Sequence, residues 1–382
     1  MERARVLIAV THLLGIGHLA RMALLARALA AAGHAVQVVS GGVKPPSLDL
    51  AGLDLVQLPP VQCRDADFST LFGPDGGIAD MTLLEHRAAL LAGAVAAFRP
   101  DVVITELYPF GRRALAAEFE ALIAAAAALD PRPALLASLR DVLNPPAKPG
   151  RAEDVLARLA RDYDAVLVHG DPAVLPLGAS WPVTPALERR LCMVGYLHGG
   201  LMAEAEGPRA GILVSGGGSG AGLALYRHAL AAAPLLPDHA WHLLVGHGVA
   251  EADFAALAGS AAGNVRVERA RPDFPALLAR AALSISQAGY NTVLDLAAAG
   301  PRAILVPFAE GREREQGLRA EALAARGLAT VVEAGTLDGL RLAAAARAAL
   351  AAPVPDWSAI RRDGAARAVA AVEAAAARAR AR

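Results

Sequence analysis

The sequence predicts an α/β fold built from two doubly wound, Rossmann-like domains. Short apolar runs alternate with longer helical patterns in both halves of the chain, which is typical of parallel sheets covered by helices. A Pro- and Gly-rich passage interrupts this alternation at residues 194–209 and is typical of an inter-domain linker. With 382 residues the chain also exceeds one ordinary hydrophobic core. We therefore expect one domain over 1–195, a second over 209–355, and a C-terminal helical segment over 356–382.

The first half begins with a βαβ unit. Residues 5–10 are a continuous apolar run, residues 19–32 carry apolar side chains at helical spacing, and residues 35–40 form the next apolar run. Such a unit is almost always right-handed, with its strands parallel. Residues 42–72 are rich in Pro, Gly and Asp and are expected to be mostly loop. Further strands are expected at 55–58, 101–105, 134–139 and 165–169, and further helices at 82–98, 112–129 and 153–161.

The second half repeats the alternation. A helix should begin at Asn291 or Thr292, which are N-capping residue types, and should run to Ala299. Gly300 then occupies the place where glycine commonly ends a helix. The other expected strands are 211–215, 241–245, 265–268, 283–286, 303–307 and 328–332, and the other expected helices are 223–233, 275–280, 337–351 and 358–380.

The composition argues against several classes of function. A formal net charge of zero and an aromatic content of 4% speak against general nucleic-acid binding. Cys63 and Cys192 are the only cysteines and lack metal-ligand spacing, which favours a reducing cytoplasm. The N-terminus lacks a signal-peptide pattern, and no run reaches the roughly 18 apolar residues of a membrane span. The Ala- and Arg-rich tail after Trp357 fits either weak peripheral membrane contact or, as we prefer, a packed surface helix.

A glycine-rich loop, Gly216-Gly-Gly-Ser-Gly220, lies between an expected strand and an expected helix. Without Cβ atoms a ligand approaches the backbone closely, and N–H groups at a helix start hold phosphate oxygens. The loop is not a P-loop, because no Lys follows at the required place. It also fails the strict dinucleotide-binding spacing, since Ala221 stands where the third glycine would fall. Phosphate binding and a flexible tight turn remain equally good interpretations.

The first strand-to-helix turn reads Gly15-Ile-Gly17-His18. It places His18 at a helix N-terminus, which disfavours the imidazolium ion and leaves a neutral, basic ring. His18 is therefore a candidate general base, and the alternative is a capping or solvent-facing histidine. Glu106 and Asp141 each follow an expected strand. Both are candidates to orient His18 or to meet an acceptor, with a salt-bridged loop residue as the alternative.

The stretch 286–316 holds a second glycine turn at Gly289 and a polar loop after the next strand. In an open parallel sheet, such loops share the ligand crevice at the carboxyl ends of the strands. Asp295 and the polar run from Glu310 to Gln316 offer hydrogen bonds to sugar hydroxyls; local charge pairs at a solvated helix start are the alternative. Two Asp-x-Asp sequences, at 65–67 and 162–164, are weak metal signals, and we expect no metal site.

Taken together, these residues resemble the GT-B glycosyltransferases, and in particular the peptidoglycan-precursor N-acetylglucosaminyltransferase group and its predicted bacterial relatives. The likeness spans nearly the whole chain and is more specific in the second half. It implies two Rossmann-like domains that face a central cleft, with the C-terminal helix crossing back to the first domain. On these grounds His18 is the expected base. The expected donor-binding residues are Gly17, Ser215, Gly217, Gly218, Ser219, Arg271, Gln287, Gly289, Tyr290, Asn291, Thr292, Asp295, Glu310, Glu315 and Gln316.

The resemblance also implies separate roles for parts of this donor set. The loop 215–220 looks like the family's diphosphate-binding loop. Asp295 stands where the family has a Glu that holds the ribose hydroxyls. Glu315 and Gln316 fall on a Gln-Gln or Asp-Gln pair that grips the donor sugar, and Arg271 falls near the backbone segment that reads the nucleobase.

The function implied is that of an inverting, metal-independent hexosyltransferase. It would move a sugar from a UDP-sugar to a hydroxyl of a small-molecule or lipid acceptor, with no cofactor and no nucleic-acid partner. His18 would take the acceptor proton. Three alternatives remain: a nucleotide-sugar hydrolase in which His18 activates water, a nucleotide-sugar 2-epimerase, and a non-catalytic nucleotide-sugar sensor.

Overall fold

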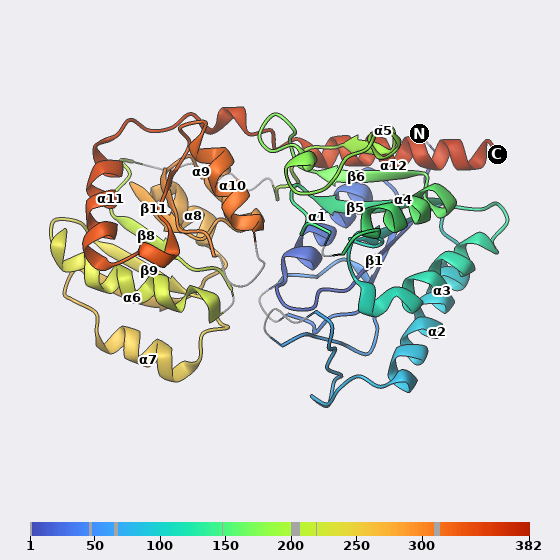
Figure 1. The fold of residues 1–382 in the computed structure, drawn as a ribbon, viewed down its shortest axis with the longest axis horizontal. Helices are drawn as coiled ribbons and strands as arrows, with labels where there is room; N and C mark the ends of the chain where they lie inside the picture. The colour runs from blue at the N-terminus through green and yellow to red at the C-terminus, as the bar shows by residue number, and fades with distance from the viewer. Residues whose placement is uncertain are drawn as a thin grey trace. The chain divides into compact units, whose positions relative to one another are not determined.

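The computed structural model describes residues 2–45, 48–64, 68–146, 148–199, 207–218, 220–308 and 314–382. The chain divides into two compact units (Figure 1). Unit 1 comprises residues 1–198 together with 361–382, and unit 2 comprises residues 199–360. Unit 2 is thus an insertion between two segments of unit 1.

Unit 1 contains a seven-stranded parallel sheet in the order β3-β2-β1-β4-β5-β6-β7. The strand order changes direction at β1, which lies between β2 and β4, and in such sheets ligands bind beside the strand ends at this switch point. The strands are β1 Arg5–Val10, β2 Ala35–Ser40, β3 Asp54–Gln57, β4 Val102–Glu106, β5 Ala134–Arg140, β6 Ala165–His169 and β7 Leu191–Met193.

Helices cover both faces of this sheet, because successive strand side chains point to opposite sides. Leu7 and Ala9 of β1 belong to a core that includes Leu91 of α2 and Phe119 of α3. Val6 and Ile8 belong to a second core, which holds buried side chains of α1 and α12. The helices of unit 1 are α1 Gly17–Ala31, α2 Met81–Phe98, α3 Ala116–Ala127, α4 Arg151–Asp162, α5 Pro185–Glu188 and α12 Gly364–Arg380.

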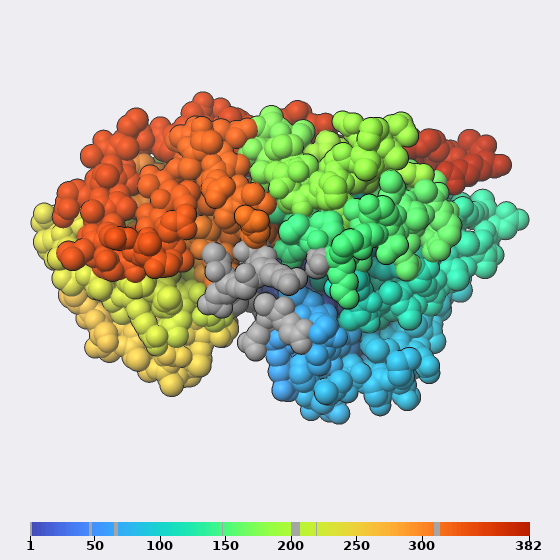
Figure 2. Space-filling model, viewed as in Figure 1, coloured from blue at the N-terminus to red at the C-terminus, as the bar shows by residue number. Residues whose placement is uncertain are grey.

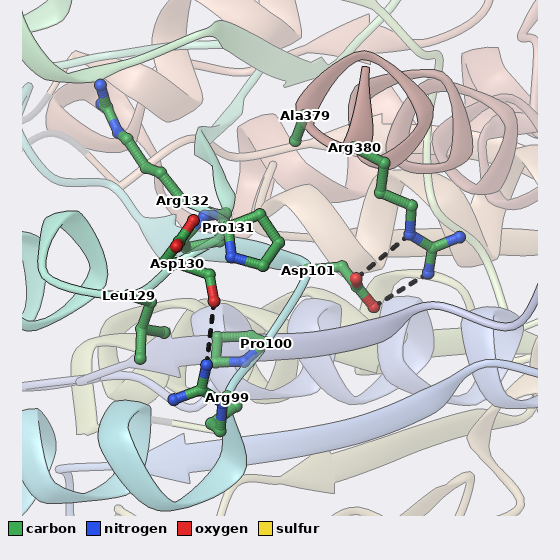
Figure 3. A pocket seen from close by; sticks show the side chains of 10 residues that line it. Arg99, Pro100, Asp101, Leu129, Asp130, Pro131, Arg132, Ala379 and Arg380 are labelled. Atoms are coloured by element: carbon green, nitrogen blue, oxygen red, sulfur yellow. Dashed lines mark hydrogen bonds and ion pairs between the residues drawn. The ribbon is translucent and has the colours of Figure 1, made fainter. Parts of the chain in front are cut away.

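Helix α12 is fixed to unit 1 at both of its ends. At its start, Gly364 lies so close to the backbone of Gly195 and Tyr196 that a Cβ atom would collide with their carbonyl oxygens. At its end, Arg380 forms an ion pair with Asp101 at 3.1 Å, beside a small pocket at the amino ends of the strands (Figure 3). The end of the chain, red in Figure 2, accordingly lies against the surface of unit 1.

Unit 2 contains a six-stranded parallel sheet in the order β10-β9-β8-β11-β12-β13. Its strands are β8 Ile212–Ser215, β9 Trp241–Val245, β10 Val265–Arg269, β11 Leu283–Ser286, β12 Arg302–Leu305 and β13 Thr330–Val331. Its helices are α6 Leu223–Ala232, α7 Glu251–Gly259, α8 Phe274–Arg280, α9 Tyr290–Ala299, α10 Glu315–Ala324 and α11 Gly339–Ala351. Both units are parallel sheets with helices, so the predicted α/β class is confirmed.

Several element boundaries differ from the prediction. Helix α9 begins at Tyr290 with Gly289 as its N-cap, so neither Asn291 nor Thr292 caps it. The expectation failed because a capping residue type does not by itself set where a helix starts; here the chain turns at the glycine. Helix α12 begins at Gly364, six residues after the predicted start, because a separate 3₁₀ turn occupies Trp357–Ala359. Strand β7 and helices α5 and α7 were not predicted.

Within the described residues, one helix is long and apolar enough to cross a membrane by length and composition, namely α2. A single helix of this kind is weak evidence for a span. Helix α2 carries Arg87, whose fully buried guanidinium is paired with Glu118 of α3 at 2.8 Å. This ion pair joins α2 to the rest of unit 1.

Candidate functional site

The first part of the candidate site lies at the carboxyl ends of β1 and β4. These strands are neighbours, so the turn that follows β1 lies beside the last residue of β4, Glu106. His18, in the first turn of α1, places its Nδ1 atom 2.6 Å from Oε1 of Glu106. The sheet thus brings together two of the residues predicted to be catalytic.

Glu106 lies at the centre of a buried cluster of charges. Arg21, one turn after His18, donates from Nη2 to the same oxygen at 2.6 Å. The Nη2 atom of Arg112 lies 3.7 Å from the other carboxylate oxygen. Burial alone would raise the pKa of Glu106, but the cations around it and the hydrogen bond from His18 outweigh burial and hold the pKa below its usual range. Glu106 is therefore ionised at neutral pH.

His18 is neutral in this environment. Burial lowers the pKa of His18 to about 3, although the charge of Glu106 acts in the opposite direction. An ionised carboxylate only accepts hydrogen bonds, so the proton of the neutral ring lies on Nδ1 and is donated to Glu106. The Nε2 atom then carries a lone pair that is ready to accept a proton. The ring is 14% exposed, which leaves an approach from solvent.

Asp141 follows β5 at the same edge of the sheet and is also buried. Its Oδ2 atom accepts a hydrogen bond of 3.4 Å from the hydroxyl of Tyr196. Gly170 packs against it so closely that a Cβ atom would meet the Cβ of Asp141 at 2.7 Å. Asp141 is thus held in place by the segments that follow β6 and β7.

Sequence reasoning gave no role to Arg21 or Arg112, although both surround Glu106. The spacing from His18 to Arg21 is one helical turn, and this spacing was the available signal. Nothing in the sequence marks Arg112, which lies in the loop after β4. In that loop, Leu107 (φ 65°) and Arg112 (φ 58°) adopt the left-handed conformation that non-glycine residues rarely take, and such strain concentrates at functional sites.

The second part of the candidate site is the glycine-rich loop of unit 2, which begins after Ser215 at the end of β8. Gly216 packs against Gly222 so tightly that a Cβ atom on Gly216 would lie 2.6 Å from the Cα of Gly222. Tyr226 of α6 holds the loop through its buried hydroxyl, which accepts from the N–H of Gly216 at 2.7 Å and donates to the carbonyl of Leu244 at 2.7 Å. The loop is thus a tight and well-supported turn.

The third part is the turn between β11 and α9. Ser286, the last residue of β11, pairs in register with Ser215, so this turn lies beside the glycine-rich loop. Gln287 links the two, since its Nε2 atom donates to the carbonyl of Ala221 at 3.2 Å. Gly289 is the N-cap of α9, and its position leaves the first N–H groups of that helix without a side-chain cap. Two helix starts therefore lie side by side in unit 2.

The first turn of α10 completes this arrangement. Gln316 accepts two backbone hydrogen bonds at its Oε1 atom, from Ala288 at 3.0 Å and from Phe308 at 3.0 Å. Arg319 donates to the carbonyl of Ala288 at 2.7 Å and to Glu315 at 2.8 Å. Two of the predicted sugar-binding residues, Glu315 and Gln316, thus lie against the glycine turn at Gly289.

The remaining predicted residues differ in their surroundings. Arg271 is exposed, and its guanidinium pairs with Asp273 at 2.7 Å. Asn291, Thr292 and Asp295 are partly buried in α9, and Tyr290 is buried. Ser219 and Glu310 lie outside the described residues.

The two Asp-x-Asp sequences were weak metal signals in the sequence. Asp162 pairs with Arg161 at 2.7 Å, and Asp164 accepts from the backbone N–H of Leu135 at 2.8 Å. Residues 65–67 lie outside the described part of the chain. Within that part, no three His, Cys, Asp or Glu side chains come together in a way that could hold a metal ion.

Residues 211–355 match the glycosyltransferase family 28 C-terminal domain. This stretch lies within unit 2 and contains the glycine-rich loop, the turn at Gly289 and the start of α10.

Curated relatives carry the name UDP-N-acetylglucosamine–N-acetylmuramyl-(pentapeptide) pyrophosphoryl-undecaprenol N-acetylglucosamine transferase. The one from Exiguobacterium sp. is 34% identical over 139 residues, which cover 36% of this chain and 38% of the relative. The one from Anaeromyxobacter sp. is 33% identical over 168 residues, or 43% of each chain. The one from Brucella abortus is 31% identical over 194 residues, or 49% of this chain and 46% of the relative. The chain thus spans less than half the length of these relatives.

Solved structures match over almost the whole chain. The calicheamicin glycosyltransferase CalG4 is 18% identical with a TM-score of 0.61, covering 100% of this chain and 97% of its own. Glycosyltransferase VinC, solved in complex with dTDP, is 19% identical with a TM-score of 0.64, covering 98% and 100%. MurG of Acinetobacter baumannii is 18% identical with a TM-score of 0.58, covering 99% and 100%. The fold is therefore the two-domain GT-B fold, as the resemblance implied.

Proposed function

We propose that this protein, whose residues 211–355 form a glycosyltransferase family 28 C-terminal domain, transfers a sugar from a nucleotide-sugar donor to an acceptor. The observation that carries the proposal is the position of this match. It falls on the unit in which the starts of α6 and α9 lie side by side. Paired helix starts suit a diphosphate, because each presents free N–H groups and the positive end of a helix dipole.

We assign the donor to unit 2. The diphosphate would lie against the loop 216–218 and the turn at Gly289, where negative charge grows as the glycosidic bond breaks. Glu315 and Gln316 would hold the sugar. We propose a UDP-sugar, because the curated relatives that match the chain are named for UDP-N-acetylglucosamine. Since helix starts would supply the positive charge, the proposed reaction needs no metal ion, and activity in excess EDTA tests this point.

We assign the base and the acceptor to unit 1. The Nε2 atom of His18 would take the proton from an acceptor hydroxyl as that oxygen forms a bond to C1 of the sugar. The bond from C1 to the diphosphate oxygen breaks at the same time, and the nucleoside diphosphate leaves with the electron pair. Attack from the face opposite the leaving group inverts the configuration at C1. Glu106 holds the ring and stabilises the imidazolium ion that forms.

We propose that the acceptor is a hydroxyl of a small molecule or a lipid. The curated relatives are named for transfer to a pyrophosphoryl-undecaprenol lipid, and the matched structures include calicheamicin and spinosyn glycosyltransferases.

The decisive experiment is mass spectrometry after incubation of the protein with a panel of UDP-sugars, with and without lipid and small-molecule extracts. A new glycoconjugate that forms only in the presence of extract supports the proposal and identifies the acceptor. Free sugar released without extract, and lost in a His18→Ala variant, would instead indicate a hydrolase in which the same base activates water. Saturable UDP binding with neither product would indicate a nucleotide-sugar sensor.

A further inference from the structure

Arg319 is the charged residue that unit 2 buries most deeply among its described residues, with 1% of its surface exposed. Burying a guanidinium group is costly unless its N–H groups are hydrogen-bonded and its charge is paired. A buried guanidinium group that meets both conditions holds its partners together. The positions of those partners therefore indicate what Arg319 does.

The partners of Arg319 belong to two different segments of unit 2. Its Nη1 atom donates to the carbonyl of Ala288, in the turn that starts α9, at 2.7 Å. Its Nη2 atom donates to Oε1 of Glu315, at the start of α10, at 2.8 Å. The guanidinium carbon also lies 5.8 Å from the centre of the Tyr290 ring, which is a favourable cation–π distance.

Gln316 binds the other backbone polar group of Ala288. Its Oε1 atom accepts from the N–H of Ala288, while Arg319 donates to the carbonyl of that residue. Both backbone polar groups of Ala288 are thus bound by side chains of α10. The glycine turn cannot shift relative to the first turn of α10 unless buried hydrogen bonds break, and each broken bond leaves an unsatisfied polar group.

We propose that Arg319 is a positioning residue of the donor site, and that it locks the phosphate-binding turn and the sugar-binding helix start into one rigid piece. This inference rests on the proposed function of unit 2. Arg319 would touch neither the phosphate nor the sugar. It would set the position of the N–H groups that follow Gly289, and it would hold the Glu315 carboxylate in place as an acceptor for sugar hydroxyls.

This role predicts a specific pattern of binding defects. Losing Arg319 should weaken the binding of UDP, because the helix start of α9 is released. It should weaken the binding of the UDP-sugar further, because Glu315 is released at the same time. A residue that served only to stabilise the unit would lower the melting temperature and leave the affinities of the folded protein unchanged.

The test compares Arg319→Met, which removes every donor, with Arg319→Lys, which keeps the charge. Arg326→Met is the matched control, because Arg326 lies just past the end of the same helix and its exposed side chain donates only locally, to the carbonyl of Ala322. Titration calorimetry with UDP and with UDP-N-acetylglucosamine, the donor for which the curated relatives are named, gives the affinities. We expect Arg319→Met to weaken UDP-sugar binding about tenfold, as for side chains that share a network, and UDP binding less. Arg319→Lys should restore part of the loss, and Arg326→Met should bind normally.

Hydrogen–deuterium exchange over residues 286–292 tests the lock without any ligand. We expect faster exchange there in both Arg319 variants than in the Arg326→Met control. If Arg319→Met does not fold, the Lys variant decides: unchanged affinities and unchanged exchange would overturn the proposal. A native protein that binds no nucleotide or nucleotide-sugar would defeat the proposed function instead, and the exchange experiment would still decide whether the lock exists.

Discussion

The Nδ1 atom of His18 lies 2.6 Å from Oε1 of Glu106, although the two residues are 88 positions apart in the chain. The contact follows from the pairing of β1 with β4, which places the end of β4 beside the turn after β1. It fixes the tautomer of the ring and leaves Nε2 as the basic atom. Substitutions and pH profiles test this arrangement and its counterpart in unit 2.

Replacing His18 by Ala should remove the general base while the donor site in unit 2 stays intact. General-base catalysis contributes about 10²–10⁴-fold, so turnover should fall by this factor. The affinity for UDP, measured by titration calorimetry, should stay at the native value. Turnover at the native rate would remove His18 from the mechanism.

Replacing Glu106 by Gln should destabilise unit 1, because Arg21 loses its buried carboxylate partner. Breaking a buried ion pair by removing one partner costs about 3–5 kcal/mol in the free energy of unfolding, which urea titration measures. Turnover should also fall, because an amide stabilises the imidazolium ion less than a carboxylate does.

The control for this variant is Glu120→Gln. Glu120 pairs with Arg161 at 3.1 Å and with Arg158 on the surface of unit 1, with 36% of its side chain exposed. The Gln amide oxygen can still accept the hydrogen bond that the Tyr108 hydroxyl donates to Glu120. Exposed ion pairs contribute about 0–1 kcal/mol, so this variant should unfold almost as the native protein does. Equal losses in the two variants would contradict the buried-cluster interpretation.

Activity should persist to a lower pH than an ordinary histidine base allows. Burial lowers the pKa of His18 to about 3, so the ring of the folded protein stays neutral from pH 8 to well below pH 6. The kcat/KM should therefore be flat between pH 5 and pH 8. A loss of half the activity near pH 6.5 would show that His18 titrates as a free imidazole.

The lowered pKa of His18 also makes the free energy of unfolding depend on pH. In the unfolded chain the pKa of His18 is near its ordinary value of 6.5, whereas burial in the folded chain lowers the pKa to about 3. His18 therefore does not change the free energy of unfolding with pH above pH 6.5. As the pH falls from 6.5 towards 3, His18 lowers this free energy increasingly. A His18→Gln variant should lose stability less steeply over this window, as urea titrations at several pH values would show.

Replacing Tyr226 by Phe should weaken the glycine-rich loop. The buried hydroxyl bonds both Gly216 and Leu244, and leaving a buried N–H unsatisfied costs about 1–3 kcal/mol. Thermal unfolding should show the loss, and UDP affinity should fall with it. Tyr163→Phe is the control, since that buried hydroxyl bonds Thr105 in unit 1; it should lower stability and leave UDP affinity unchanged.

Replacing Gln316 by Glu tests the sugar contact in isolation. The Oε1 atom of Gln316 already accepts two backbone bonds, which leaves the amide nitrogen as the group available to a ligand. A carboxylate keeps both backbone bonds but cannot donate. The ratio of UDP-sugar affinity to UDP affinity should therefore fall about tenfold, as for a hydrogen bond to a buried polar group.

The Gln316→Met variant separates an effect on stability from an effect on sugar binding. It loses both backbone bonds, so it should also lower the melting temperature, whereas Gln316→Glu should not. If the affinity ratio in Gln316→Glu equals the native ratio, the amide does not contact the donor sugar.

Most of the architecture was predictable because parallel strands are continuous apolar runs. Strands β1, β2, β6, β9 and β11 begin and end where the sequence predicts. Strand β7 was missed because its three residues, Leu191–Met193, follow a Pro-rich passage and are too short to show a pattern. The start of α9 was predicted too late, because the helix begins directly after the glycine turn and has no capping side chain.

The sequence predicts which residues belong to the candidate site better than it predicts which of them contact one another. The order of the strands places Glu106 beside His18, and strand order is a long-range property that no local pattern encodes. The sequence did not predict Arg319 as a site residue for a related reason. It lies three residues past Gln316 in a helix made mostly of Ala, Leu and Glu, where an arginine is normally a surface residue. Only the packing of α10 against the turn at Gly289 reveals its role.

The division of unit 1 into two chain segments sets an order of events during synthesis. Helix α12 supplies Ala368, Val372 and Ala376 to one of the two cores of unit 1, yet the ribosome makes it after unit 2. Unit 2 is a continuous segment and has all of its residues before α12 emerges. The nascent first segment must therefore keep one face of its sheet partly uncovered while the whole of unit 2 is translated, and during this interval that face is open to chaperones.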